Sequence, residues 1–547
     1  MIRQLQKYHL VLFSTCIVLG VLLNITGNSL IWDDNYFIIK NSALGNPSAF
    51  PQVLIASFWD NSSFTAYQPH TFWRPLTSLL LWLVGFAGRS PWVFHSTSLI
   101  VAIGAAIAFA RLLNQLFYPT DLHHPLGYIA ALIYLIHPLT TEVLCLVMNL
   151  ADHLCLLFMF VSLRATILQL TTTPRRSRDI YIFITALMAC FSKEFGVLSI
   201  VFFPLVSLLL LSAGQGKISL LSRKHLSLWC ATILPAVTYL LLRFLLNHHI
   251  QTEHTTGEIA QLFFLAIGQG AWYILNVGPS GNHVFVSPQD TAPWIMSLLV
   301  VCAIIILPVI VYWRKKSIPF FSVSILFGLV LLLPAVAGVS IISENIRFPL
   351  RYFHLLLVGA VMGICPQLRA ILNSRLKYAI LLFIILLSGM SWIKIQQWRS
   401  PVSLFRAEVM YNPSSPNATI NYCEALFNRH AFTDAEEALD RFEQRTPKYI
   451  SPEYQARFLS IRSQILFARD GKLNEAQLLA EKAVRLRPYA PLLISRLVHI
   501  YDAGGYHERA IHLLNNTIQN QHFTAAQRKR LREELKFIKT LHKQPPK

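Results

Sequence analysis

An acidic pair, Asp33 and Asp34, follows shortly after the first long apolar run, in the segment "NSLIWDDNYFIIKN". Charged residues that flank a membrane span are usually Lys or Arg. The pair therefore belongs either to a solvated acidic loop or to a catalytic site held just outside a membrane. Because consecutive residues point in different directions, one Asp can face a reacting group while the other orients it, supports a turn or helps to bind a metal. For Asp34, a position at a helix N-terminus is an equally good explanation.

Other ionisable residues lie within or at the ends of apolar runs, where charge is costly and is usually functional. We expect the following residues at one membrane face: Asp33, Asp34, Arg74, His137, Glu142, Asp152, Lys193, Glu194, Arg347, Arg351 and Tyr352. Arg74, Lys193 and Arg351 are cations of the kind that hold phosphate. A carboxylate within hydrogen-bond reach of a hydroxyl can act as a general base. Cations and carboxylates at the same membrane face favour the transfer of a sugar from a lipid phosphate, in which the cations stabilise the leaving phosphate.

Structural explanations compete with a shared site for several of these residues. Lys193 and Glu194 are adjacent and can form an ion pair at a tight turn, and His137 precedes a proline that can end a span. Asp152 lies in an apolar stretch, so we expect it to pair with Lys193 or Arg351. The tryptophans of this region are more typical of an interfacial belt than of a sugar-binding platform, namely Trp32, Trp59, Trp73 and Trp92.

The elements that must position these residues are membrane helices. Of the 547 residues 54% are hydrophobic and only 14% are charged, whereas soluble domains carry about 25% charged residues. The sequence predicts an all-α polytopic membrane protein with a transmembrane helix bundle. We expect eleven spans, at about 8–25, 92–116, 125–143, 150–170, 180–194, 196–213, 226–246, 293–312, 318–338, 352–367 and 378–395. The apolar runs 74–86 and 260–277 are expected to lie at the interface or to re-enter the membrane.

The 47 basic residues outnumber the 27 acidic ones, and their distribution predicts orientation rather than nucleic-acid binding. In the first part of the chain they cluster between apolar runs, at 175–178, 222–225, 313–316 and 368–377. This is the positive-inside pattern, and an odd number of spans places the tail on the same side as the acidic pair. The eight cysteines lack zinc-ligand spacing, so we predict no metal site and leave a divalent-metal requirement open.

The tail, residues 398–547, is charged and helical in pattern and contains a weak internal repeat. The segments 471–488 and 505–521 align at a 34-residue offset, with Gly471 over Gly505 and Ala476 over Ala510. A looser copy occupies 430–442. A 34-residue helix–turn–helix period is typical of tetratricopeptide repeats, which stack into a solenoid that commonly binds an extended peptide. An unrelated helical bundle is the alternative.

Several short motifs occur in a fixed order: "WDDNYFI", "RPLT", "HPLTTEVLCLVMNLADHL", "SKEFGVL" and "RFPLRYFHL", followed by the repeats of the tail. Together they resemble the TMTC-like (transmembrane and TPR repeat-containing) proteins, which are similar to protein O-mannosyltransferases of the glycosyltransferase C superfamily. The resemblance implies a polyprenyl- or dolichyl-phosphate sugar as donor and inversion at the sugar. It implies these roles: Asp33 as base and Asp34 as its support; Arg74, Lys193 and Arg351 toward the phosphate; His137, Glu142, Asp152, Glu194 and Tyr352 in the pocket.

Two features depart from that family: Leu150 stands where it often has Arg before Ala-Asp, and the tail is shorter than in animal members. The leading expectation is a glycosyltransferase domain, 1–397, that transfers a sugar, most specifically mannose, to a protein presented by a tetratricopeptide-like domain, 398–547. The alternatives are a lipid or polysaccharide acceptor, or a membrane-anchored scaffold without activity. A transporter is disfavoured because the polar residues gather at one face. A bacterial inner membrane is favoured over the endoplasmic reticulum.

Overall fold

The computed structural model describes residues 2–58, 72–212, 225–246, 256–276, 283–285, 319–342, 347–445, 451–523 and 525–541, with isolated positions between 295 and 313. These residues form two compact units, one that reaches to Arg399 and one that begins at Ser400. Both units are helical. The strands in the described ranges are β1 (His283–Phe285) and β2 (Arg347–Pro349), which pair in antiparallel fashion with Val284 opposite Phe348.

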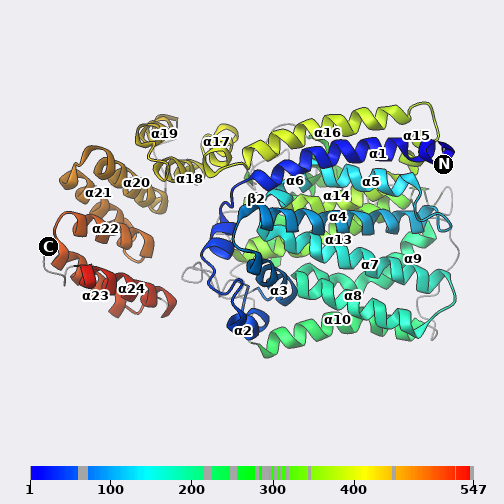
Figure 1. The fold of residues 1–547 in the computed structure, drawn as a ribbon, viewed down its shortest axis with the longest axis horizontal. Coiled ribbons are helices and arrows are strands. Elements are labelled where there is room, and N and C mark those ends of the chain that lie inside the picture. The colour runs from blue at the N-terminus through cyan, green and yellow to red at the C-terminus, as the bar shows by residue number, and fades with distance from the viewer. Residues whose placement is uncertain are drawn as a thin grey trace. The chain divides into compact units, whose positions relative to one another are not determined.

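Five helical segments of the first unit are long and apolar enough to cross a membrane. They lie in α1 (Ile2–Leu22) with η1 (Leu23–Gly27), α4 (Pro91–Phe117), η6 (Val147–Asn149) with α7 (Leu150–Thr171), α10 (Leu226–Leu245) and α16 (Lys377–Gln397). α1 packs beside α16, and α4 packs against α7 (Figure 1). The five coincide with five of the predicted spans, and together they fit a multi-pass membrane protein.

Two further apolar segments are bent rather than straight. α5 (Pro125–Ile136) meets α6 (Pro138–Cys145) at 63°, and η9 (Leu350–Phe353) with α14 (His354–Gly363) meets α15 (Cys365–Leu372) at 49°. The first bend has a local cause. Pro138 has no N–H to donate, and the His137 ring accepts a hydrogen bond from the Leu139 N–H at 3.3 Å, which starts a new helix.

The described residues thus hold five to seven candidate spans, so the eleven predicted spans are reproduced only in part. The predicted spans at 180–194 and 196–213 correspond to α8 (Arg176–Ser192), η7 (Glu194–Val201) and α9 (Phe202–Ser212), each shorter than the roughly 20 residues that cross a bilayer. The predicted span at 293–312 lies mostly outside the described residues. α8 packs between α7 and α10 (Figure 1).

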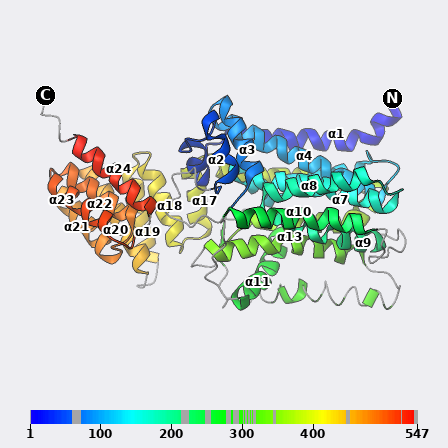
Figure 2. The same ribbon diagram turned by 90° about the horizontal axis from the view of Figure 1, so that it is seen from below.

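Shorter apolar helices complete the unit. α2 (Phe50–Ile55) packs against α3 (Pro75–Val84), which covers the predicted interfacial run, and α11 (Thr256–Leu275) covers the run at 260–277. α13 (Phe320–Ile342) packs against α14 and runs nearly parallel to α7, α8 and α10 (Figure 2). The placement of α3 and α11 relative to a membrane stays a prediction.

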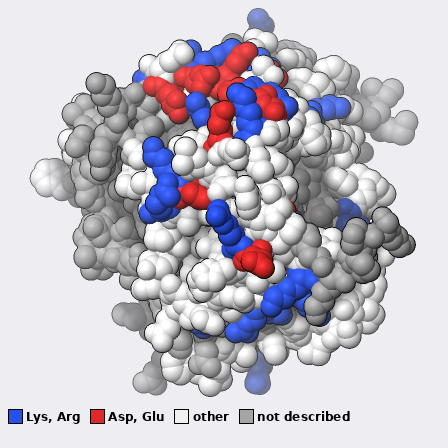
Figure 3. Space-filling view, turned by 90° about the vertical axis from the view of Figure 1, so that its left-hand side faces the viewer, with Lys and Arg blue, Asp and Glu red and all other residues white. Residues whose placement is uncertain are grey.

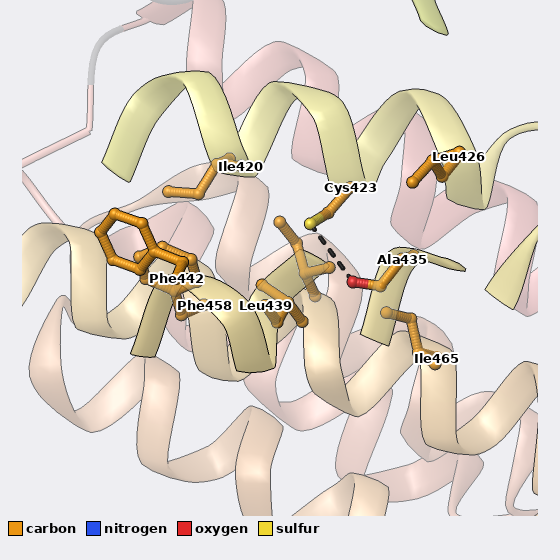
Figure 4. Packing of buried hydrophobic residues seen from close by; sticks show 9 residues of the cluster. Ile420, Cys423, Leu426, Ala435, Leu439, Phe442, Phe458 and Ile465 are labelled. Atoms are coloured by element: carbon orange, nitrogen blue, oxygen red, sulfur yellow. Dashed lines mark hydrogen bonds between the residues drawn. The ribbon is translucent and has the colours of Figure 1, made fainter. Parts of the chain in front are cut away.

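The second unit contains α17 (Pro401–Tyr411), α18 (Pro416–Phe427), α19 (Phe432–Arg445), α20 (Pro452–Asp470), α21 (Leu473–Leu486), α22 (Pro491–Ala503), α23 (His507–Gln519) and α24 (Ala525–Leu541). Each helix packs against the next one along the chain. Figure 4 shows one core, where α18, α19 and α20 bury Ile420, Leu439 and Ile465, and the Cys423 thiol donates to the Ala435 carbonyl at 3.4 Å.

The positions aligned by the sequence repeat have matching surroundings. Ala476 and Ala510 are both fully buried. Gly471 and Gly505 both adopt a positive φ, 62° and 77°, in the turns before α21 and α23. Residues with a side chain rarely adopt this conformation, so both turns favour glycine. The tetratricopeptide interpretation itself stays a prediction.

Acidic and basic side chains are neighbours on the face drawn in Figure 3 rather than forming separate patches. In the second unit, Arg462 of α20 pairs with Asp440 of α19 at 2.7 Å, and Arg469 pairs with Glu436. Exposed pairs of this kind contribute at most about 1 kcal/mol each. They link consecutive helices and leave little unbalanced charge between them.

Candidate active site

Asp34 anchors the loop after α1 to the start of α7. Its side chain is fully buried, and its two carboxylate oxygens accept hydrogen bonds from the N–H groups of Val147 and Met148 at 3.0 and 2.9 Å. Asp34 also precedes η2 (Asn35–Ile39) but makes no side-chain cap there. Burial raises the pKa of Asp34 to about 8, although the two N–H bonds and the nearby charge of Arg351 act in the opposite direction. The buried carboxyl group therefore fixes the geometry of the loop.

Asp33, by contrast, is half-buried and more accessible to a reactant. The residue before it, Trp32, has a φ of 58°, which is unusual for a bulky side chain. The Trp32 ring stacks on Trp398, with ring centroids 6.5 Å apart and planes inclined by 28°. Strained backbone of this kind costs about 1–3 kcal/mol and persists where the surroundings hold it. The strain lies directly beside the accessible carboxylate.

Arg351 in η9 is a cation near the ring of Trp32 in this loop. Its guanidinium carbon lies 5.9 Å from the centre of the Trp32 ring and 5.6 Å from that of Tyr352. Its Nη1 is buried and has no hydrogen-bond partner among the residues that the structure describes. A buried donor without a partner is costly, and an anion would satisfy it. Arg351 is thus the strongest phosphate-binding candidate of the group.

Lys193 and Asp152 form a buried ion pair near Tyr352. The Lys193 Nζ lies 2.5 Å from Oδ2 of Asp152, and the two side chains are 14% and 3% exposed. Asp152 also faces Nε2 of His354 at 3.9 Å. Lys193 is 5.9 Å from the centre of the Tyr352 ring, so one aromatic ring lies close to both Lys193 and Arg351. Of the two partners expected for Asp152, the structure selects Lys193.

Arg74 and Glu194 form a bidentate pair between the start of α3 and η7. Nε of Arg74 lies 2.9 Å from Oε1 of Glu194, and Nη2 lies 2.9 Å from Oε2. The guanidinium also packs on the rings of Phe58 and Phe72, at 5.1 and 5.0 Å. Burial opposes ionisation of Glu194, but the adjacent Arg74 outweighs it and holds the pKa of Glu194 below its usual value. Lys193 and Glu194 therefore pair with different partners, and a role of Arg74 at a phosphate stays a prediction.

His137 and Glu142 occupy the bent segment that backs the site. The ring of His137 caps α6, and its Nε2 lies 3.3 Å from the Ile274 carbonyl oxygen. Glu142 is fully buried and pairs with Lys394 of α16 at 3.3 Å. Leu139 between them packs in one cluster with Leu350 and Phe353 of η9. Both residues hold elements together, and a contact of either with substrate stays a prediction.

The structure thus brings one group together and adds residues that the sequence did not single out. The predicted members of the group are Asp33, Asp34, Asp152, Lys193, Arg351 and Tyr352. Arg347 is the first residue of β2, and its side chain is outside the part of the chain that the structure describes. The additions to this group are His354 and Trp398. Outside the group, the structure adds Lys394 as the partner of Glu142. A lone lysine in the apolar run of α16 was a usable signal for Lys394, whereas nothing in the sequence pairs Trp398 with Trp32.

The tryptophans divide between two roles. Trp92 is 61% exposed, as expected for an interfacial belt, but Trp73 is buried and stacks on Tyr239 at 5.6 Å. Trp59 lies outside the described residues. Within the described ranges, no three His, Cys, Asp or Glu side chains are grouped so as to hold a metal ion.

Comparison with known proteins finds a distant similarity. No family model matches the chain. A stretch of 179 residues, 32% of the chain, is 25% identical to a Caenorhabditis elegans protein named as a protein O-mannosyl-transferase. The aligned stretch covers only 25% of that relative's length. This distant similarity to a named transferase suggests that the chain is a glycosyltransferase.

Proposed function

We propose that the protein is an integral-membrane glycosyltransferase that transfers a sugar from a polyprenyl- or dolichyl-phosphate donor to a hydroxyl group of a protein. The observation that carries the proposal is the buried Nη1 of Arg351 beside the Asp33–Asp34 loop, which has no hydrogen-bond partner in the described part of the chain. An anion site next to an accessible carboxylate is what such a transfer requires. The similarity to a protein named as an O-mannosyl-transferase favours mannose as the sugar and protein as the acceptor.

In the proposed reaction Asp33 is the general base. Its carboxylate takes the proton of the acceptor hydroxyl while that oxygen forms a bond to the anomeric carbon of the sugar. The bond from this carbon to the phosphate oxygen breaks, and the lipid phosphate leaves with the electron pair. Arg351 and Lys193 stabilise the charge that develops on the phosphate. Attack from the face opposite the phosphate inverts the sugar.

The remaining residues of the group position these three. Asp34 holds the loop against Val147 and Met148, so that Asp33 stays accessible. Asp152 fixes the ammonium group of Lys193, and Tyr352 keeps Lys193 and Arg351 near one another. Precise placement of this kind supports catalysis because small displacements of a catalytic group are costly.

We assign the second unit a peptide-presenting role as a tetratricopeptide-like solenoid. Its support is the matched burial of Ala476 and Ala510 and the matched backbone of Gly471 and Gly505. We place the reaction on the extracytoplasmic side, because the positive-inside pattern puts the acidic loop there. A bacterial inner membrane is the favoured location, with the endoplasmic reticulum as the alternative.

The test uses full-length protein purified in detergent with radiolabelled polyprenyl-phosphate-mannose and a membrane-protein extract. Wild type should label protein, whereas Asp33→Asn should lose about 10²–10⁴-fold in rate because the base is removed. Glu437→Gln, an exposed carboxylate of α19, is the matched control and should behave as wild type. Arg351→Gln should raise the KM for the donor, and Arg351→Lys should restore part of it.

Each other outcome changes the proposal in a defined way. Unchanged turnover in Asp33→Asn removes Asp33 from the mechanism. Label in lipid or polysaccharide keeps the chemistry and replaces the acceptor. An inactive wild type with every lipid-linked sugar tested leaves a membrane-anchored scaffold as the function.

A further inference from the structure

A second cationic site lies toward the other end of α7, the helix that carries Asp152. A cavity of about 470 Å³ opens between α4, α7 and α8. One of its cations, Arg164, follows Asp152 by 12 residues in α7, which places it roughly 18 Å further along the helix axis. The cavity is therefore separate from the candidate active site.

Among the residues that the structure describes, four arginines line this cavity and no acidic residue does. They are Arg111 of α4, Arg164 of α7, and Arg175 and Arg178 at the start of α8. Arg178 already donates to the Leu168 carbonyl at 2.9 Å and so closes the end of α7. The carboxylate nearest in sequence, Asp179, accepts a hydrogen bond from Gln169 at 2.9 Å and does not line the cavity. The positive charge of the cavity is thus unbalanced within the described residues.

Arg164 is the informative member, because it lies inside an apolar helix that is long enough to cross a membrane. Its Nε is buried and has no hydrogen-bond partner among the residues that the structure describes. A second cation, Arg111 of α4, lines the same cavity. Charged residues within a span are expensive and are usually paired. Two arginines that share a cavity lined by no carboxylate of the described residues call for an anion in that cavity.

Apart from the hydroxyl groups of Ser177 and Tyr181, the rest of the cavity wall is apolar. Ile107 and Gly104 on α4 face Leu157 and Val161 on α7. If a lipid headgroup binds at the arginines, its acyl chain can lie against this apolar wall. We propose that the cavity binds the phosphate headgroup of an anionic membrane lipid, with an acyl chain along α4 and α7. Arginine suits this task because its fork matches two phosphate oxygens.

The test is native mass spectrometry of the full-length protein in detergent, titrated with phosphatidylglycerol, with phosphatidylcholine of the same chains, and with inorganic phosphate. Phosphatidylglycerol should bind more tightly than phosphatidylcholine. Arg164→Gln should weaken phosphatidylglycerol binding about fivefold or more, as should Arg111→Gln, because each arginine near a membrane surface adds a comparable attraction to an anionic lipid. Arg375→Gln, an exposed arginine outside the cavity, should bind as wild type does.

Equal binding of phosphatidylglycerol by wild type, Arg164→Gln and Arg111→Gln would overturn the proposal. An equal loss in Arg375→Gln would also overturn it, because the effect would then be general surface attraction. Inorganic phosphate that binds as tightly as the lipid would refute the role of the apolar wall. Arg111 is exposed, so its variant remains informative if Arg164→Gln does not fold.

Discussion

Removing one partner of the Arg74–Glu194 pair should destabilise the membrane unit far more than removing both. The two side chains are 13% and 20% exposed and share a bidentate contact. Breaking a buried pair from one side leaves an uncompensated charge and costs about 3–5 kcal/mol, whereas replacing both partners is often nearly neutral. Because both side chains retain some exposure, we expect about 3 kcal/mol for Arg74→Gln or Glu194→Gln and under about 1 kcal/mol for the double variant.

Thermal unfolding in detergent, followed by tryptophan fluorescence, measures this difference. Each single variant should melt about 3–5 °C below wild type, and the double variant should recover most of that loss. The control cycle uses Arg441 and Glu437, an exposed pair on α19 with side chains 68% and 56% exposed. Its coupling should stay below about 0.5 kcal/mol. Additive effects of Arg74→Gln and Glu194→Gln would refute the reasoning.

The same variants separate a structural role of Arg74 from a role at the donor phosphate. The pKa of Glu194 is held below its usual 4.5 by Arg74. The stability from this pair is therefore present above pH 4.5 and is lost as the pH falls through the lowered pKa. Glu194→Gln should remove that part of the pH dependence. If Arg74 also holds phosphate, the stable double variant should still show a raised KM for the donor.

Three further predictions follow from buried groups elsewhere. Burial raises the pKa of Asp34 from 3.8 to about 8, so the stability from its protonated form is complete below pH 3.8 and is lost as the pH rises through about 8. The Tm of wild type should fall over this range, and Asp34→Asn should lack that slope. Glu142→Gln should cost about 3–5 kcal/mol because it leaves the Lys394 charge buried without this carboxylate, and adding Lys394→Met should restore much of the Tm. Leu439→Ala should cost the tail about 2–5 kcal/mol; hydrogen–deuterium exchange should then show faster exchange in α18 to α20, and unchanged protection there would contradict the core shown in Figure 4.

Hydropathy located the straight helices of this chain but not its bends. The runs at 8–25, 92–116 and 378–395 became helices with almost those bounds, because a long apolar run has few other stable states in a membrane. The run at 125–143 was predicted as one span. A window of average hydropathy does not register that Pro138 lacks an N–H or that His137 caps a new helix. The break is a local hydrogen-bonding event inside a uniformly apolar stretch.

The position of ionisable residues within or beside apolar runs likewise identified many residues of the candidate site, but not all of their partners. Asp152 had two candidate partners in sequence, and its carboxylate contacts Lys193 in the structure. The sequence favoured no partner for Glu142, because Lys394 lies in a span far along the chain. Partner choice depends on which helices are neighbours, and a single sequence does not contain that information. The acidic pair could be split into an accessible and a supporting residue only because adjacent side chains diverge.

The contacts around Asp34 also impose an order on biogenesis. Asp34 binds backbone that lies 113 residues later, Arg74 pairs across 120 residues, and Trp32 stacks on Trp398. A ribosome that inserts the chain from its N-terminus makes the first loop early and its last partner after α16. The site therefore closes only when the whole helical unit has been synthesised. A nascent or truncated chain would carry the acidic pair without these later partners, so the proposed sugar transfer would begin only after insertion is complete.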